Sequence, residues 1–84
     1  MYDYFFTFRS VTRAQQAVLV LMRHGIAGQL ERTPQKISTN GCGYGVFVRG
    51  NEVYRAAGIL RLKHLVFEKV YRIKLDGYPE EAGI

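Results

Sequence analysis

The sequence has a single cysteine, two prolines, no tryptophan and no apolar stretch long enough to cross a membrane. One cysteine cannot form an internal disulfide, and the two histidines, His24 and His64, do not have the spacing of a zinc site. We therefore expect no structural metal and no cofactor. The start of the chain lacks the basic region and apolar core of a signal peptide, so we expect a cytoplasmic protein without a membrane partner.

Acidic residues are scarce, with seven against twelve Lys and Arg and a net charge of +5. The sequence contains no carboxylate pair, no Ser/His/Asp set and no phosphate-binding Gly-x-x-x-x-Gly-Lys pattern. The basic residues are spread along the chain rather than gathered in a block, which favours solvated surface charge over a nucleic-acid-binding segment. These absences favour a carrier or accessory protein over a stand-alone enzyme.

The length of 84 residues predicts one small domain, which we place at residues 1–76, followed by a flexible tail at residues 77–84. The aromatic residues 2–8 predict a first strand. Ser10 is a typical helix N-cap, and apolar residues at helical spacing predict a helix over 11–24, with Gly25 as its C-terminal cap. Strands are predicted at 26–32, 44–49 and 67–75, and a second helix at 52–64.

This order of elements predicts an α+β fold: a ferredoxin-like βαββαβ two-layer sandwich with a four-stranded antiparallel sheet. In that fold the first and third strands are central and antiparallel. The loop that enters the strand at 44–49 then lies where the first strand ends. We therefore expect Cys42 near Arg9 and Ser10, at the N-terminus of the first helix.

Cys42 lies in a glycine-rich turn, between Gly41 and Gly43. Glycines allow successive backbone N–H groups to converge into an anion-binding concavity, and a helix N-terminus favours an anion as well. Such surroundings lower the pKa of a cysteine from ~8.5 to roughly 3.5–7.5 and produce the nucleophilic thiolate. The alternative is that the glycines only shape the loop and that Cys42 fills it.

The stretch from Thr33 to Gly43 has the pattern Thr-Pro-x-x-Ile-Ser-x-x-x-Cys-Gly. Together with Phe8-Arg9-Ser10 and an alanine-rich helix, this pattern resembles the small bacterial family of selenium/sulfur carrier-like proteins, a domain of unknown function. The likeness covers residues 4–73. Gln35 stands where the family usually has arginine, and the loop before Cys42 is slightly longer. The resemblance implies that a carrier role rests on Cys42.

As a carrier, Cys42 would accept sulfur or selenium as a persulfide or selenosulfide and pass it to an acceptor protein. The backbone amides of Gly43 and Tyr44 are the expected anion donors. Ser38 and Ser10 are candidate hydrogen-bonding side chains, and Arg9 and Lys36 are candidate positive charges. The expected partners are sulfur or selenium donor and acceptor proteins.

Two other functions are compatible with the same elements. RNA-recognition modules share the predicted order of strands and helices, and Gly43-Tyr44-Gly45 matches the centre of their third-strand pattern, but Cys42, Val46 and Arg49 depart from it. The other alternative is a protein-docking or homodimer contact through an aromatic sheet face, with Cys42 incidental.

Overall fold

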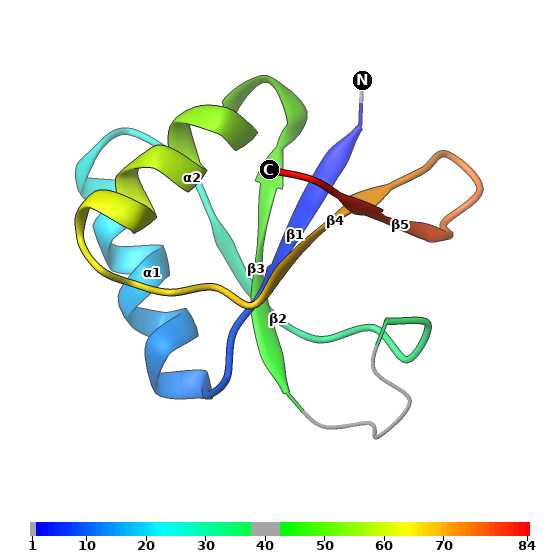
Figure 1. Cartoon of the computed structure of the whole chain (residues 1–84), viewed down its shortest axis with the longest axis horizontal. Coiled ribbons are helices and arrows are strands. Elements are labelled where there is room, and N and C mark those ends of the chain that lie inside the picture. The colour runs from blue at the N-terminus through cyan, green and yellow to red at the C-terminus, as the bar shows by residue number, and fades with distance from the viewer. Residues whose placement is uncertain (1, 38–42) are drawn as a thin grey trace.

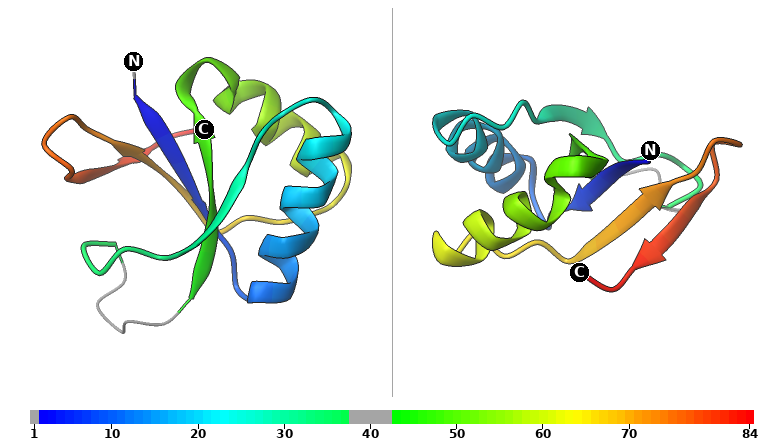
Figure 2. Two further views of the ribbon diagram at one scale, coloured as in Figure 1. Left: turned by 180° about the vertical axis from the view of Figure 1, so that it is seen from behind. Right: turned by 90° about the horizontal axis from the view of Figure 1, so that it is seen from above.

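The computed structural model describes residues 2–37 and 43–84. Two helices, α1 (Val11–Arg23) and α2 (Val53–Leu62), cover one face of a five-stranded antiparallel sheet, as Figure 1 shows. The strands are β1 (Asp3–Thr7), β2 (Gln29–Arg32), β3 (Tyr44–Arg49), β4 (Lys69–Ile73) and β5 (Pro79–Ala82), in the sheet order β2-β3-β1-β4-β5. A short 3-10 turn, η1 (Gly50–Glu52), leads from β3 into α2. The predicted α+β class is confirmed, and the view from above in Figure 2 separates the two layers.

The prediction of four strands was wrong, because residues assigned to the tail at 77–84 form β5 along the outer edge of β4. Two ion pairs join these strands, Lys69 Nζ to Glu81 Oε1 at 3.3 Å and Arg72 Nη1 to Glu80 Oε1 at 2.8 Å. Backbone pairing to an existing strand therefore makes a strand of a segment with low β-propensity.

Between the helices and the sheet lies the main core, built from the alternating residues of the central strands. Tyr4, Phe6 and Phe8 from the first strand region, with Val46 and Val70 beside Phe6, pack against Ala14, Ala17 and Leu21 of α1 and Ala56, Ala57 and Leu60 of α2. Small alanines on both helices let these helices lie close to the aromatic strand. The close packing of both helices on β1 therefore fixes the end of this strand, where the chain continues into the N-terminus of α1.

The opposite face of the sheet also buries an aromatic side chain. Phe5 is fully buried, and its ring centre lies 4.7 Å from that of Phe47 on β3. The connection after β2 runs out on this side, where Lys36 Nζ lies 4.1 Å from the centre of the Tyr78 ring in the β4–β5 turn. Two segments far apart in the sequence therefore meet on the side away from the helices.

Candidate functional site

A backbone hydrogen bond joins the two ends of the Thr33–Gly43 stretch, both of which the structure describes. The N–H of Thr33, a buried residue, donates a hydrogen bond to the Gly43 carbonyl at 3.0 Å, directly beyond the Arg32–Tyr44 pair of strands β2 and β3. On the near side, the Ile37 N–H donates to the Pro34 carbonyl at 2.9 Å and closes a turn. The predicted site residues Ser38 and Cys42 lie outside the described residues. The structure thus defines the two ends of the cysteine-containing segment, Thr33 and Gly43 with the Arg32–Tyr44 pair beside them, which we call the base of this segment.

Gly43 and Gly45 are required by the backbone of this base. Gly43 has φ +115°, a region that residues with a side chain rarely adopt, and a Cβ there would lie 3.4 Å from Thr33 Oγ1. Gly45 pairs with Thr7 across the sheet, and a Cβ on it would overlap the Phe6 carbonyl oxygen and lie 2.5 Å from Phe5 Cζ. These two glycines therefore have structural reasons that do not depend on anion binding.

Tyr44 connects this base to the start of α1. Its carbonyl oxygen accepts a hydrogen bond from the Phe8 N–H at 3.4 Å, and its side chain is half-buried against the main core. The next residues after Phe8 are Arg9 and Ser10, which directly precede α1. The structure thus brings Gly43 and Tyr44 to the end of the sheet from which Arg9 and Ser10 lead into the helix.

Ser10 is the N-cap of α1, as predicted, because its hydroxyl oxygen accepts a hydrogen bond from the Arg13 N–H at 3.3 Å. The first turn of α1 contains no acidic residue. Arg9 and Arg13 are both exposed there, so two cations add to the positive end of the helix dipole. This end of the molecule is therefore suited to a nearby anion.

Lys36 lies apart from that group. Its ammonium lies over the Tyr78 ring, in the turn where the Tyr78 N–H donates to Asp76 Oδ1 at 2.9 Å. A cation over an aromatic face is held electrostatically, so this lysine links two loops. The sequence predicts Lys36 as a positive charge beside Cys42, which lies outside the described residues, and it does not predict the contact of Lys36 with the β4–β5 turn.

The aromatic residues of the central strand do not form an exposed platform for stacking bases. Tyr4 and Phe6 belong to the core under the helices, and Phe5, on the other face, is 0% exposed. A stacking platform requires ring faces open to solvent. The burial of these rings disfavours the RNA-recognition alternative.

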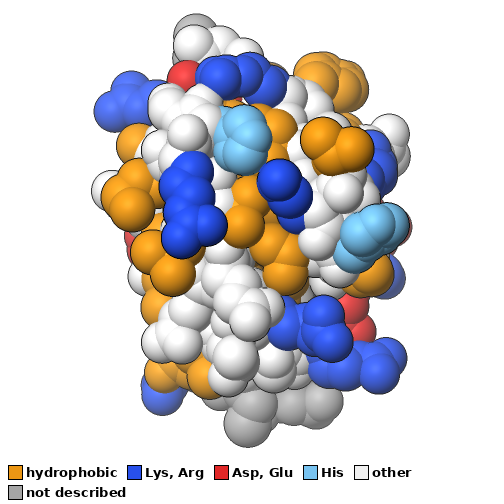
Figure 3. Space-filling view, turned by 90° about the vertical axis from the view of Figure 1, so that its left-hand side faces the viewer, with side chains coloured by type: hydrophobic (Ala, Val, Ile, Leu, Met, Phe, Trp, Pro, Cys, Tyr) orange, Lys and Arg blue, Asp and Glu red, His pale blue; other side chains and the backbone are white. Residues whose placement is uncertain are grey.

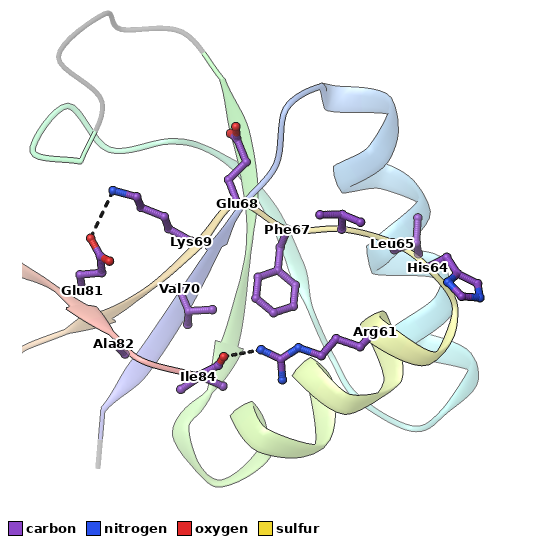
Figure 4. Close-up of a pocket in the computed structure, with 11 residues that line it drawn as sticks. Arg61, His64, Leu65, Phe67, Glu68, Lys69, Val70, Glu81, Ala82 and Ile84 are labelled. Carbon is purple, nitrogen blue, oxygen red and sulfur yellow. Dashed lines mark hydrogen bonds and ion pairs between the residues drawn. The ribbon is translucent and has the colours of Figure 1, made fainter.

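A cleft of about 400 Å³ between the end of α2 and β5 was missed by sequence reasoning, which had assigned β5 to a tail. As Figure 4 shows, Phe67 and Arg61 lie on one side, with the Arg61 guanidinium hydrogen-bonded to the Ile84 carbonyl, and the Lys69–Glu81 pair lies on the other. The hydrogen bond to Glu81 and the negative charge of that residue raise the pKa of Lys69 above its usual value of 10.5. Arg72 is held in the same way on β4, because the Tyr4 hydroxyl accepts from Nε at 3.2 Å and, with Glu80, raises the pKa of the guanidinium.

In residues 2–37 and 43–84, His, Cys, Asp and Glu nowhere gather in groups of three or more that would suit a metal ion. Neither described helix combines the length and apolar character that a membrane crossing needs.

Comparison with known proteins gives a family match. The family described as "Putative Se/S carrier protein-like" matches residues 3–72, a span that contains β1 to β3, both helices, position 42 and all of β4 except its last residue. No curated protein and no solved structure gives a significant match. The family match confirms the resemblance that the Thr33–Gly43 pattern indicates.

Proposed function

The chain belongs to the Se/S carrier protein-like family, and from that premise we propose that it carries sulfur or selenium on Cys42 between a donor and an acceptor protein. The family match over residues 3–72 is the observation that carries this proposal. Cys42 is the chain's single cysteine, so no other thiol competes for the role.

The transfer that we propose is a thiolate exchange that needs no added oxidant or reductant. The Cys42 thiolate attacks the outer sulfur of a donor persulfide, R–S–SH. A new S–S bond forms on Cys42, the S–S bond of the donor breaks, and the donor leaves as the thiolate R–S⁻ while the proton stays on the transferred sulfur. An acceptor thiolate then attacks that outer sulfur and releases Cys42 as a thiolate. Selenium in the outer position follows the same course.

The described residues around the base of the cysteine-containing segment support an anion at this end of the sheet. Arg9 and Arg13 flank the N-terminus of α1, and no carboxylate lies in its first turn. We propose that this positive end stabilises the Cys42 thiolate, aided by the amides of Gly43 and Tyr44 and by the side chains of Ser38 and Ser10. Lys36 is left out of this set, because its ammonium lies at Tyr78.

We also propose that the sheet is a ferredoxin-like arrangement extended by one edge strand. The order β2-β3-β1-β4 within the sheet supports this assignment, with β5 added beside β4. In this arrangement the loop into β3 and the start of α1 share one end of the sheet, which is the geometry that the proposed anion site needs.

The carrier proposal is tested by loading the protein with a chemical persulfide donor, glutathione persulfide, and measuring the intact mass. We expect the mass to rise by one sulfur atom, the gain to disappear with dithiothreitol, and Cys42→Ser to gain nothing. Absence of loading on the folded wild-type chain, with normal loading of the unfolded chain, would contradict the proposal.

The activation of the thiol is tested separately by the pH dependence of Cys42 alkylation. A midpoint well below that of the chain in denaturant is expected, and Arg9→Gln should move the midpoint towards the denatured value, because it removes a positive charge from the α1 N-terminus. Arg49→Gln, an exposed cation at the far end of β3, is the matched control and should leave the midpoint unchanged. Equal midpoints in the folded and denatured chain would leave Cys42 without activation.

A further inference from the structure

Charge is divided between the two layers of the molecule. Residues 4–30, which contain α1, and residues 53–67, which contain α2, include no Asp or Glu. All seven acidic residues lie elsewhere in the chain, one of them, Glu52, at the N-cap of α2. The two helices and the C-cap of α2 carry Arg13, Arg23, Arg55, Arg61 and Lys63. Figure 3 shows this face, where basic and hydrophobic side chains lie side by side and acidic ones occur only at its margins. The helix layer is therefore a basic surface.

A shallow groove of about 370 Å³ crosses this surface between α1 and the segment that follows α2. Leu19, Val20 and Leu65 supply its apolar lining, and Arg23 and Lys63 supply its charges. On α1, the lining residue Leu19 is 50% exposed and its neighbour Met22 is 61% exposed. On the other side of the groove, Leu62 and Val66 flank the lining residues Lys63 and Leu65 and are 73% and 71% exposed. Aliphatic side chains at this exposure gain by being covered.

The two cations of the groove have no carboxylate partner within the described part of the chain, where the ion pairs are Lys69–Glu81 and Arg72–Glu80. The arginines of α2 differ from them, because Arg55 donates to the His24 carbonyl and Arg61 to the Ile84 carbonyl. Arg23 and Lys63 are therefore the charges that are available to an incoming group.

We propose that this groove docks an acidic, amphipathic segment of a partner protein. The apolar side of such a segment covers Leu19, Val20 and Leu65, and its carboxylates pair with Arg23 and Lys63. Charge complementarity selects this occupant, because a second copy of the same basic face would be repelled. RNA fits less well, since the apolar lining residues are aliphatic and the groove includes no aromatic ring on which a base can stack.

This docking is independent of the chemistry at Cys42. It uses residues of α1 and of the segment after α2, and no group that the proposed transfer requires. Binding should therefore be the same for the wild-type chain and for Cys42→Ser. A carrier that fails to load with sulfur can still bind the acidic segment, so the two proposals fail separately.

The test uses a labelled synthetic amphipathic helix of leucine and glutamate, with its leucine and lysine counterpart as the matched probe, and binding is followed by fluorescence anisotropy. We expect the acidic peptide to bind and the basic peptide not to bind. The double variant Arg23→Glu, Lys63→Glu should weaken binding at least about tenfold, and Leu19→Gln should weaken it severalfold. Arg49→Glu, on β3, should leave binding within about twofold.

Three outcomes would overturn the proposal. The first is equal binding of the acidic and basic peptides, or binding of neither. The second is an equal loss with Arg49→Glu, which would indicate general attraction to a positive protein. The third is tighter binding of a single-stranded poly-uridine RNA or of phosphatidylserine vesicles that the Arg23 and Lys63 substitutions abolish. Urea unfolding of each variant confirms that a loss of binding does not reflect a loss of fold.

Discussion

Gly45 shows at the scale of one residue how the sheet limits the sequence. It lies opposite Thr7 in the β1–β3 pair, with the Phe5 ring over it and the Phe6 carbonyl beside it. A methyl group there meets backbone that cannot turn aside as a side chain can. The fully buried Phe5 is accommodated because β3 has no side chain at this position.

We predict that Gly45→Ala destabilises the protein by about 2 kcal/mol or more, within or above the range for overpacked sites. Gly58→Ala is the matched control, because it is exposed on α2 with nothing within 4 Å of the added Cβ. That change should stabilise the protein by about 0.5–1 kcal/mol through helix propensity. Urea unfolding of both variants measures the two effects, and a neutral Gly45→Ala would show that both the β1 backbone at Phe6 and the Phe5 ring can shift to admit the methyl group.

Part of the site was predictable at this scale and part was not. The N-cap role of Ser10 follows from its position before an apolar helical pattern, and the structure confirms it. The sequence predicts an anion-binding turn at Gly41 and Gly43, but it gives no sign that Gly45 is required by its contact with Phe5, a residue forty positions earlier. A cross-strand approach of that kind leaves no local signal in the sequence, because it depends on the register of β1 against β3.

At the scale of elements, α1 lacks an acidic residue where most helices benefit from one. Ser10 is the N-cap and Arg13 is the third helical residue, the position that glutamate occupies in a capping box. The positive charge of Arg13 opposes the helix dipole at this end. The arrangement reduces local stability and keeps the α1 N-terminus positive, as the proposed anion site requires.

Arg13→Glu should therefore stabilise the protein by about 0.5–1.5 kcal/mol, because the glutamate reaches back to the N-cap N–H and also favours the dipole. The same substitution in the last turn, Arg23→Glu, is the control and should destabilise the protein, since it places a negative charge at the negative end of the helix. Thermal and urea unfolding give both values. Destabilisation by Arg13→Glu would indicate that the arginine makes a contact that matters more than the dipole.

Strand β5 is the element that could not be predicted from the sequence. Pro79, Glu80 and Glu81 have low intrinsic β-propensity, and only the open edge of β4 and the partners Lys69 and Arg72 make a strand of them. By contrast β3 was predicted with its observed bounds, Tyr44–Arg49, because its apolar run is local. Elements that carry their own pattern are predictable from sequence, whereas an edge strand that depends on its neighbour is not.

At the scale of the whole molecule, the separation of charge has an energetic consequence. The two helices combine several cations with no acidic residue within their own spans, and the remaining parts of the chain, including the α2 N-cap Glu52, carry all seven acidic residues. Like charges on one surface repel each other by a few tenths of a kcal/mol per close pair. The proposed docking groove needs the same excess of positive charge. The charges that allow the helix face to bind an acidic segment therefore also lower the stability of the fold.

Salt should therefore stabilise this protein. Raising ionic strength from about 0.01 M to about 1 M shortens the Debye length from ~30 Å to ~3 Å and screens the repulsion within the helix layer, while the two exposed ion pairs on β4 and β5 lose little. We expect the urea midpoint to rise over this range in sodium chloride. In the double variant Arg13→Glu, Lys63→Gln, the rise of the urea midpoint with salt should be smaller, because the helix layer then carries fewer positive charges. A urea midpoint that falls with salt would show that the ion pairs contribute more to stability than the repulsion removes. An equal rise of the midpoint in the double variant would show a general salt effect. Either result would mean that the basic helix face carries no energetic cost.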